Sequence, residues 1–130
     1  MKSEREMNQV WLVDDDGEMS RAVALMLSLL DCKARIFPNS RQAAKALLAG
    51  GTPEILFLDV NMPEVSGLSL LEFVRHQPEW QKLPIWMLSA ESTDTDVDKA
   101  LALGANGYLV KPVSFEELEK AVRQAIPSKI

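Results

Sequence analysis

The sequence has one cysteine, one histidine and no long apolar run, and these shortages exclude several classes of protein. Cys32 has no second cysteine to pair with, so an internal disulfide is excluded and nothing indicates a secreted, disulfide-linked scaffold. The longest apolar stretch, 22–30, contains Ser28 and is too short to span a bilayer. Residues 1–6 are charged and lack the apolar segment of a signal peptide. We therefore expect a cytoplasmic protein that does not associate with membranes.

Positive charge is also in short supply. The chain has 14 Lys and Arg residues against 19 Asp and Glu residues, a formal net charge of −5, which argues against direct binding to nucleic acid. Its 130 residues, 47% of them hydrophobic, are enough for one domain with a buried core. Because no internal repeat, low-complexity tract or linker is visible, we expect a flexible tail at 1–7, one domain at 8–127 and a short tail at 128–130.

Strand-like and helix-like segments alternate along the chain, which is typical of βα units and a parallel sheet. Four nearly continuous apolar runs predict strands covered by helices on both faces. These runs are Val10–Val13, Ile55–Leu58, Ile85–Leu88 and Tyr108–Val110. The segment Ala34–Phe37 is shorter and carries a charge, so it fits an edge strand better.

Apolar residues at helical spacing predict helices between these strands. The first helix is expected to bury one face, formed by Met19, Ala22, Val23, Met26, Leu29 and Leu30. The glycine pair at 50–51 ends the second predicted helix, and the third stops before Pro78. The last predicted helix begins at a capping box made by Ser114 and Glu117.

A reactive polar group directly follows each of the four apolar strands. The groups are Asp14-Asp15, Asp59, Ser89 and Lys111. Ligand sites in open parallel sheets form beyond the carboxyl ends of the strands, so these side chains should meet at one edge. Three carboxylates at close range repel one another unless a cation is present, and Mg²⁺ prefers oxygen ligands.

The same set suits phosphoryl transfer, which asks a protein mainly for positioning and charge neutralisation. Asp59 is a candidate nucleophile toward phosphorus, Lys111 supplies a positive charge, and the Ser89 hydroxyl can donate a hydrogen bond to a phosphoryl oxygen. Taken singly, each has a plainer interpretation: Ser89 caps a helix, Lys111 is a solvated charge, and Asp16 with its neighbours is a turn and helix cap. Pro112 follows Lys111 and makes that peptide bond a candidate cis bond.

The chain resembles a CheY-like response regulator receiver domain of bacterial two-component signalling. The matching segments are Val13-Asp14-Asp15, Leu58-Asp59 with Met62-Pro63 and Gly67, Ser89-Ala90, and Lys111-Pro112, in the family's order and spacing. The match covers almost the whole chain. It implies an α/β fold with a single doubly wound five-stranded parallel sheet, flavodoxin-like strand order 2-1-3-4-5, and helices on both faces. Ser66 and Ser89 replace residue types that are commoner in the family, without loss of chemistry.

The resemblance also implies metal-binding roles. Asp59 resembles the phosphoacceptor, Asp15 the direct ligand of Mg²⁺ (or Mn²⁺), and Asp14 a ligand that acts more through water. Asn61 would contribute its backbone carbonyl to the metal.

Further roles implied by the resemblance concern the phosphoryl group. Ser89 and Lys111 would bind it, and Ser89 would reorient together with Tyr108 as a switch. Asn61 and Glu91 occupy positions that tune the lifetime of the aspartyl phosphate.

The phosphoryl group must come from elsewhere, because His76, the sole histidine, is expected to lie exposed at the end of the third predicted helix. The resemblance implies a phosphohistidine donor on a sensor histidine kinase or phosphotransfer protein. The signal would pass to a downstream protein target through the surface running from Thr93 through the last helix. A phosphorylation-dependent homodimer stays open, and the domain would catalyse only its own phosphorylation and dephosphorylation.

Other functions fit the sequence less well or stay open. An aspartate-nucleophile phosphatase of the haloacid dehalogenase type needs a second acid two residues after the nucleophile, where this chain has Asn61. A dinucleotide-binding domain needs a glycine-rich loop after the first strand, where this chain has Asp14-Asp15. A receiver-like scaffold that no longer uses phosphate is disfavoured by the complete set of site residues. A receiver segment of a larger transcription regulator or hybrid kinase stays open.

Overall fold

A computed structural model of the chain describes residues 7–62, 64–90 and 94–126. Strands and helices alternate in the order β1 (Asn8–Val13), α1 (Gly17–Ser28), β2 (Cys32–Phe37), α2 (Ser40–Leu48), β3 (Ile55–Asp59), α3 (Gly67–Arg75), the 3₁₀ helix η1 (Pro78–Trp80), β4 (Ile85–Ser89), α4 (Asp94–Ala102), β5 (Gly107–Val110) and α5 (Phe115–Ala125). Apart from Met7, the tails expected at 1–7 and 128–130 lie outside the described residues.

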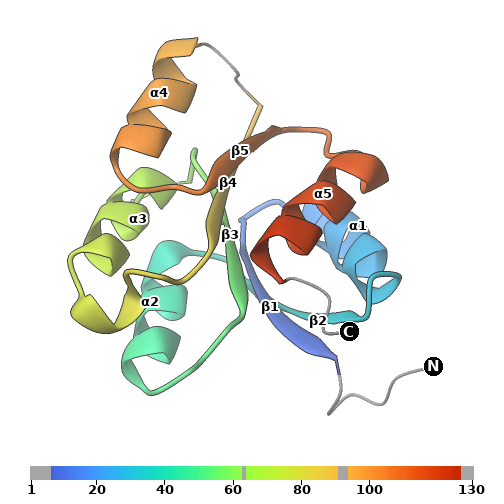
Figure 1. Cartoon of the computed structure of the whole chain (residues 1–130), viewed down its shortest axis with the longest axis horizontal. Coiled ribbons are helices and arrows are strands. Elements are labelled where there is room, and N and C mark those ends of the chain that lie inside the picture. The colour runs from blue at the N-terminus through green and yellow to red at the C-terminus, as the bar shows by residue number, and fades with distance from the viewer. Residues whose placement is uncertain (1–6, 63, 91–93, 127–130) are drawn as a thin grey trace.

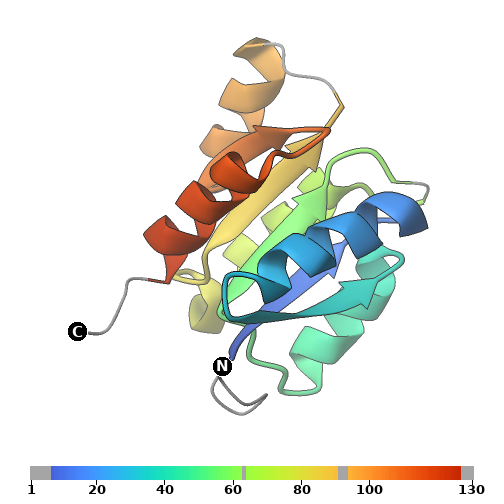
Figure 2. The same cartoon turned by 90° about the vertical axis from the view of Figure 1, so that its right-hand side faces the viewer.

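The five strands form one parallel sheet in the order β2-β1-β3-β4-β5, which confirms the predicted fold. Helices α1 and α5 cover one face, and α2, α3 and α4 lie on the other (Figures 1 and 2). Because all strands run the same way, their carboxyl ends share one edge, where the predicted site residues stand.

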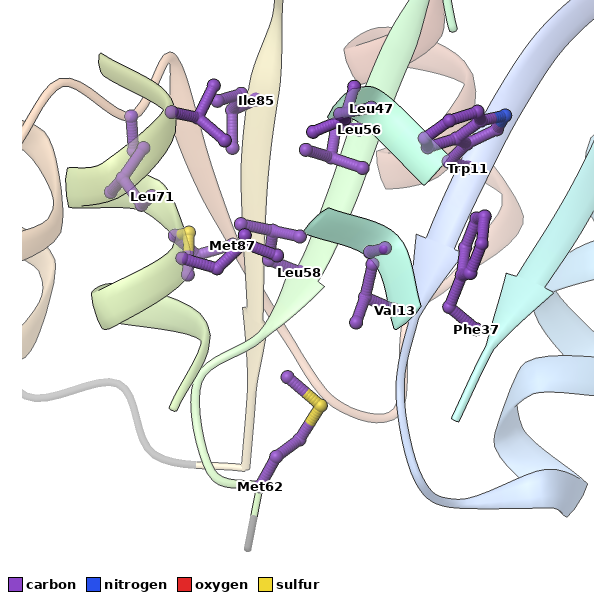
Figure 3. Close-up of a cluster of buried hydrophobic side chains, with 14 of the residues drawn as sticks. Trp11, Val13, Phe37, Leu47, Leu56, Leu58, Met62, Leu71, Ile85 and Met87 are labelled. Atoms are coloured by element: carbon purple, nitrogen blue, oxygen red, sulfur yellow. The ribbon is translucent and has the colours of Figure 1, made fainter. Parts of the chain in front are cut away.

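Two hydrophobic cores sit on opposite faces of the sheet, and each strand contributes alternate residues to both. The core under α1 and α5 contains the strand residues Val10, Leu12, Ile55, Phe57, Trp86, Leu88 and Leu109, with helix residues such as Val23, Leu27, Leu118 and Val122. Figure 3 shows the core under α2, α3 and α4, where Leu56, Leu58, Ile85 and Met87 face Leu47 and Leu71. In that view the side chain of Met62, from the loop after β3, points toward this core.

Helix ends follow local chemistry that the sequence predicted. The Asp16 carboxylate accepts hydrogen bonds from the backbone N–H groups of Glu18 and Met19, both at 3.1 Å, so Asp16 caps α1. The Ser114 hydroxyl accepts from the N–H of Glu117 at 3.2 Å and donates to its carboxylate at 3.0 Å. Residue Gly50, with φ +101°, follows the end of α2.

The structure corrects two expectations and adds one element. Strand β2 starts at Cys32 and is as long as β1, although it does lie at the sheet edge. In α1, Ser20, Val23 and Leu27 are buried. The predicted residues Met19, Met26 and Leu30 are partly buried against the same core. Ala22 is exposed, and Leu29 is 71% exposed, four residues after the exposed Leu25. The 3₁₀ helix η1 was not predicted.

No helix within residues 7–62, 64–90 and 94–126 combines the length and apolar character needed to cross a membrane.

Candidate functional site

The side chains of Asp14, Asp59 and Lys111 lie on the same side of the sheet edge. Each continues the alternation of side chains between the two faces of its strand. Each stands two positions after a residue of the α1–α5 core, and side chains two apart on a strand share a face. The preceding core residues are Leu12, Phe57 and Leu109. Asp14 and Asp59 are only 2% and 4% exposed, so the edge holds two buried carboxylates.

The ammonium group of Lys111 bridges these two carboxylates. Its Nζ lies 2.8 Å from Asp14 Oδ2 and 3.3 Å from Asp59 Oδ2, and the Lys111 side chain is 15% exposed. The Lys111–Pro112 peptide bond is cis, as predicted. Sequence positions 14, 59 and 111 are therefore brought together in one ion-pair cluster.

Backbone N–H groups satisfy the second oxygen of each carboxylate. Asp14 Oδ1 accepts from the N–H of Asp16 at 2.9 Å, and Asp59 Oδ1 accepts from the N–H of Asn61 at 3.2 Å. In the loops after β1 and β3, the backbone N–H two residues after each aspartate thus binds the carboxylate of that aspartate. Asp14 Oδ2 is buried, and its partner among the described residues is the Lys111 ammonium at 2.8 Å.

The residues present fit a hard divalent cation. One carboxylate oxygen each from Asp14, Asp15 and Asp59 lie within 4.8 Å of one another, and the Asp15 side chain is exposed where the other two are buried. Oxygen donors of this type match Mg²⁺ or Mn²⁺ better than soft metals.

The electrostatics of the site disfavour a charged Asp59 when no cation is bound. Burial and the neighbouring charge of Asp14 raise the pKa of Asp59 to about 6, against the opposing pull of Lys111. Burial alone would lower the pKa of Lys111, but its contacts with Asp14 and Asp59 outweigh burial and raise it. Lys111 therefore stays protonated, and Asp59 is the group whose charge is costly.

Ser89 and Tyr108 stand on the neighbouring strands β4 and β5. Ser89 is buried at the end of β4, and its carbonyl accepts from the N–H of Lys111 at 2.7 Å. Ser89 pairs with Val110 and Met87 pairs with Tyr108, so Ser89 and Tyr108 lie on the same face of the sheet, two residues apart in register. Tyr108 is half-buried and packs against the α2–α4 core. Their switch roles stay predictions.

The turn between β3 and α3 depends on a glycine. A Cβ atom on Gly67 would lie 2.0 Å from the carbonyl oxygen of Asp59, and the N–H of Gly67 donates to the Val60 carbonyl at 3.2 Å. Only glycine allows this approach, which holds the loop that carries Asn61. The side chain of Ser66 caps α3 by accepting from the N–H of Ser69.

Other predicted residues lie away from the cluster or beyond the described chain. His76 is exposed, as predicted, and its Nδ1 lies 2.7 Å from the Glu72 carbonyl on α3. Asn61 is exposed in the loop after β3, and its role as a carbonyl ligand stays a prediction. Glu91 and Thr93 lie outside the described residues. No local sequence pattern marked Arg75, whose hydrogen bonds are described below.

Comparisons with known proteins agree with this geometry. The model of the response regulator receiver domain family matches residues 10–123. RcaC from Microchaete diplosiphon is 36% identical over 115 residues, which cover 88% of this chain but 18% of RcaC. Chemotaxis protein CheY1 from Helicobacter pylori is 33% identical over 110 residues, covering 84% of this chain and 89% of CheY1.

A solved structure shares the fold. Chemotaxis protein CheY4 from Vibrio cholerae superposes with a TM-score of 0.83 at 30% identity, covering 92% of this chain and 99% of that one. With the family match over residues 10–123 and the acidic cluster at the sheet edge, the chain belongs to the response regulator receiver domain family of two-component signalling.

Proposed function

We propose that this domain is a phosphoacceptor switch in which Asp59 receives a phosphoryl group from a phosphohistidine of a partner protein. The observation that carries the proposal is the Asp59 carboxylate, buried at the sheet edge, 3.3 Å from the Lys111 ammonium and grouped with two further carboxylates. Sensor histidine kinases and phosphotransfer proteins are the classes of partner that present such a donor.

The reaction forms a bond between an Asp59 carboxylate oxygen and phosphorus while the phosphorus–nitrogen bond of the donor breaks. The electron pair of that bond returns to the imidazole of the donor. Lys111 neutralises charge on the phosphoryl oxygens from its position beside Asp59. Mg²⁺, or Mn²⁺, held by Asp14, Asp15, Asp59 and the Asn61 carbonyl, would neutralise the remaining charge and keep Asp59 ionised.

The switch itself follows from the added charge and acceptor oxygens of the phosphoryl group. We infer that the Ser89 hydroxyl turns toward them, and that Tyr108 follows because both side chains lie on one face of β4 and β5. The α4–β5–α5 surface would then present the output to a downstream protein, in the cytoplasm and without direct contact to nucleic acid. A homodimer through this surface is one such output, and Asn61 and Glu91 would tune how long the state lasts.

Intact-mass measurement after treatment with acetyl phosphate and Mg²⁺ tests the proposal. The wild type should gain one phosphoryl group, Asp59→Asn should gain none, and EDTA should prevent the reaction. Asp31→Asn makes the same chemical change in the turn before β2 and serves as the matched control, which should react like the wild type. No adduct on the wild type, or an adduct that survives Asp59→Asn, contradicts the proposal.

Two alternatives have their own tests. A phosphatase would need a general acid two residues after Asp59, where the exposed amide of Asn61 cannot serve, and multiple turnovers on a phosphate monoester would revive that class. The chain spans less than a fifth of RcaC, so the domain also fits a receiver segment of a larger regulator or hybrid kinase. Detection of this sequence within a longer polypeptide in the source organism would decide this.

A further inference from the structure

Arg75, the last residue of α3, donates hydrogen bonds to the nearby segment around η1 and to the turn between α4 and β5, which lies 29 to 31 residues further along the chain. Its Nε donates to the carbonyl of Gly104 at 2.8 Å, and its Nη1 donates to the carbonyl of Trp80 at 2.7 Å. Its Nη2 donates to the Leu83 carbonyl at 2.7 Å and to Asn106 Oδ1 at 2.9 Å. No ion pair to Arg75 occurs among the described residues, so the guanidinium acts purely as a hydrogen-bond donor.

The bond to Gly104 places Arg75 at the end of α4. The N–H of Ala105 donates to the Ala100 carbonyl and that of Gly104 to the Leu101 carbonyl, both at 3.0 Å, which is a Schellman ending. Gly104 has φ +109°, and a Cβ there would lie 2.8 Å from Arg75 Cγ. The guanidinium therefore rests against the glycine that ends the helix, where a cation is also favoured by the helix dipole.

Asn106 extends the network to the starts of two strands. Its Oδ1 accepts from the N–H of Ile85 at 2.9 Å as well as from Arg75, and its own N–H donates to the Ile85 carbonyl at 2.7 Å. Ile85 opens β4, and Asn106 immediately precedes β5. The whole network thus lies at the amino ends of these strands, the edge of the sheet opposite Asp59.

We propose that Arg75 is a positioning residue that fixes the C-terminal end of α4, so that phosphorylation moves the helix about this end. The movement of α4 on phosphorylation rests on the proposed function, whereas the anchoring of α4 by Arg75 does not. A rearrangement that begins at Ser89 reaches α4 from the phosphoacceptor edge, whereas the far end of α4 is held by one side chain to α3, η1 and the start of β5. Lysine cannot replace the forked donor, because it lacks the geometry to reach these oxygens together.

Backbone hydrogen exchange of the unphosphorylated protein tests the anchoring itself. Arg75→Lys should lower the protection of the Ala105 and Asn106 amides about tenfold or more, while amides in β1 and β3 keep theirs and show that the fold is intact. Arg123→Lys, the same change at an exposed position of α5, should leave all of these amides unchanged. Unchanged protection of Ala105 and Asn106 in Arg75→Lys overturns the proposal.

Exchange after treatment with acetyl phosphate and Mg²⁺ tests the movement. In the wild type, protection should change at Asp96–Lys99 and stay constant at Ala105 and Asn106, whereas in Arg75→Lys the change should extend to both. An equal change at the two ends of α4 in the wild type overturns the proposal. Absence of any adduct on the wild type contradicts the proposed function instead, and the unphosphorylated comparison still decides whether Arg75 anchors α4.

Discussion

The surroundings of Asp59 disfavour the ionised form of its carboxyl group. Its carboxyl has an ordinary pKa of 3.8, which burial and Asp14 raise to about 6 in the folded protein. The folded state then binds the proton more tightly than the unfolded state, so stability falls as the pH rises from about 4 to about 6. Above that window the folded protein bears the full cost of an ionised Asp59, unless a cation offsets it.

Replacing Asp59 with asparagine should therefore stabilise the metal-free protein at neutral pH. In EDTA at pH 7.5 we expect Asp59→Asn to raise the free energy of unfolding by roughly 1–2 kcal/mol, after allowance for solvent screening. At pH 5, where the wild-type carboxyl is largely protonated, the gain should be smaller. Urea unfolding at the two pH values measures the difference, and an equal effect at both, or a loss at pH 7.5, would contradict it.

Asp15 differs from Asp14 and Asp59 because its side chain is exposed and can turn toward a cation. A ligand that binds only the folded state stabilises it, by about 1.4 kcal/mol at ten times its dissociation constant. We expect Mg²⁺ to raise the midpoint of thermal unfolding of the wild type and to have little effect on Asp15→Asn. The matched control is Asp16→Asn, whose side-chain carbonyl can still cap α1 and which should keep the increment caused by Mg²⁺. Equal increments in both variants would remove Asp15 from the metal site.

At the scale of elements, the junction of β3 and α3 is the tightest connection near the site. Gly67 packs against the backbone of Asp59, whereas Gly50, after α2, has open space around its Cβ position and needs glycine only for its positive φ. Gly67 is thus required because a Cβ would overlap with backbone, and Gly50 is required because of its positive φ.

Alanine at these two positions should have unequal costs. We expect Gly67→Ala to lower the free energy of unfolding by about 3 kcal/mol or more, because the β3–α3 turn must open to admit the Cβ. Gly50→Ala should cost about 1 kcal/mol. Gly67→Ala should also lower the yield of phosphorylated protein, because the Asp59 backbone must shift. Urea unfolding compares the two, and a cost for Gly50→Ala that matches or exceeds that of Gly67→Ala would show that the overlap is relieved elsewhere.

On the scale of the whole molecule, the two cores share one sheet, so neither should unfold without the other. Leu27 of α1 and Leu71 of α3 are fully buried on opposite faces of the sheet. We expect alanine at either position to cost about 2–5 kcal/mol, and each variant to unfold in one transition that coincides by circular dichroism and tryptophan fluorescence. Leu29→Ala, at an exposed position, should change stability by less than about 0.5 kcal/mol. Separate transitions for the two faces would contradict a single cooperative domain.

Local sequence pattern determined the alternation of strands and α-helices and the edge at which the polar groups gather. Apolar runs mark β1, β3, β4 and β5, and a residue two positions beyond a buried one in an extended segment projects to the same side. The sequence alone therefore predicts the approach of Asp14, Asp59 and Lys111. It predicts the caps at Asp16 and Ser114 too, because their partners lie within three residues.

Which groups on that edge are buried together and which stay exposed depends on contacts between segments that are distant in sequence. The tertiary structure separated Asp14, paired with Lys111, from its neighbour Asp15, and it placed Leu27 rather than Leu29 in the core. It also revealed the bonds from Arg75 to Gly104 and Asn106. The physical reason is distance along the chain: a guanidinium that binds carbonyl groups some thirty residues away leaves no periodicity or spacing in the sequence, whereas alternation and capping act between near neighbours.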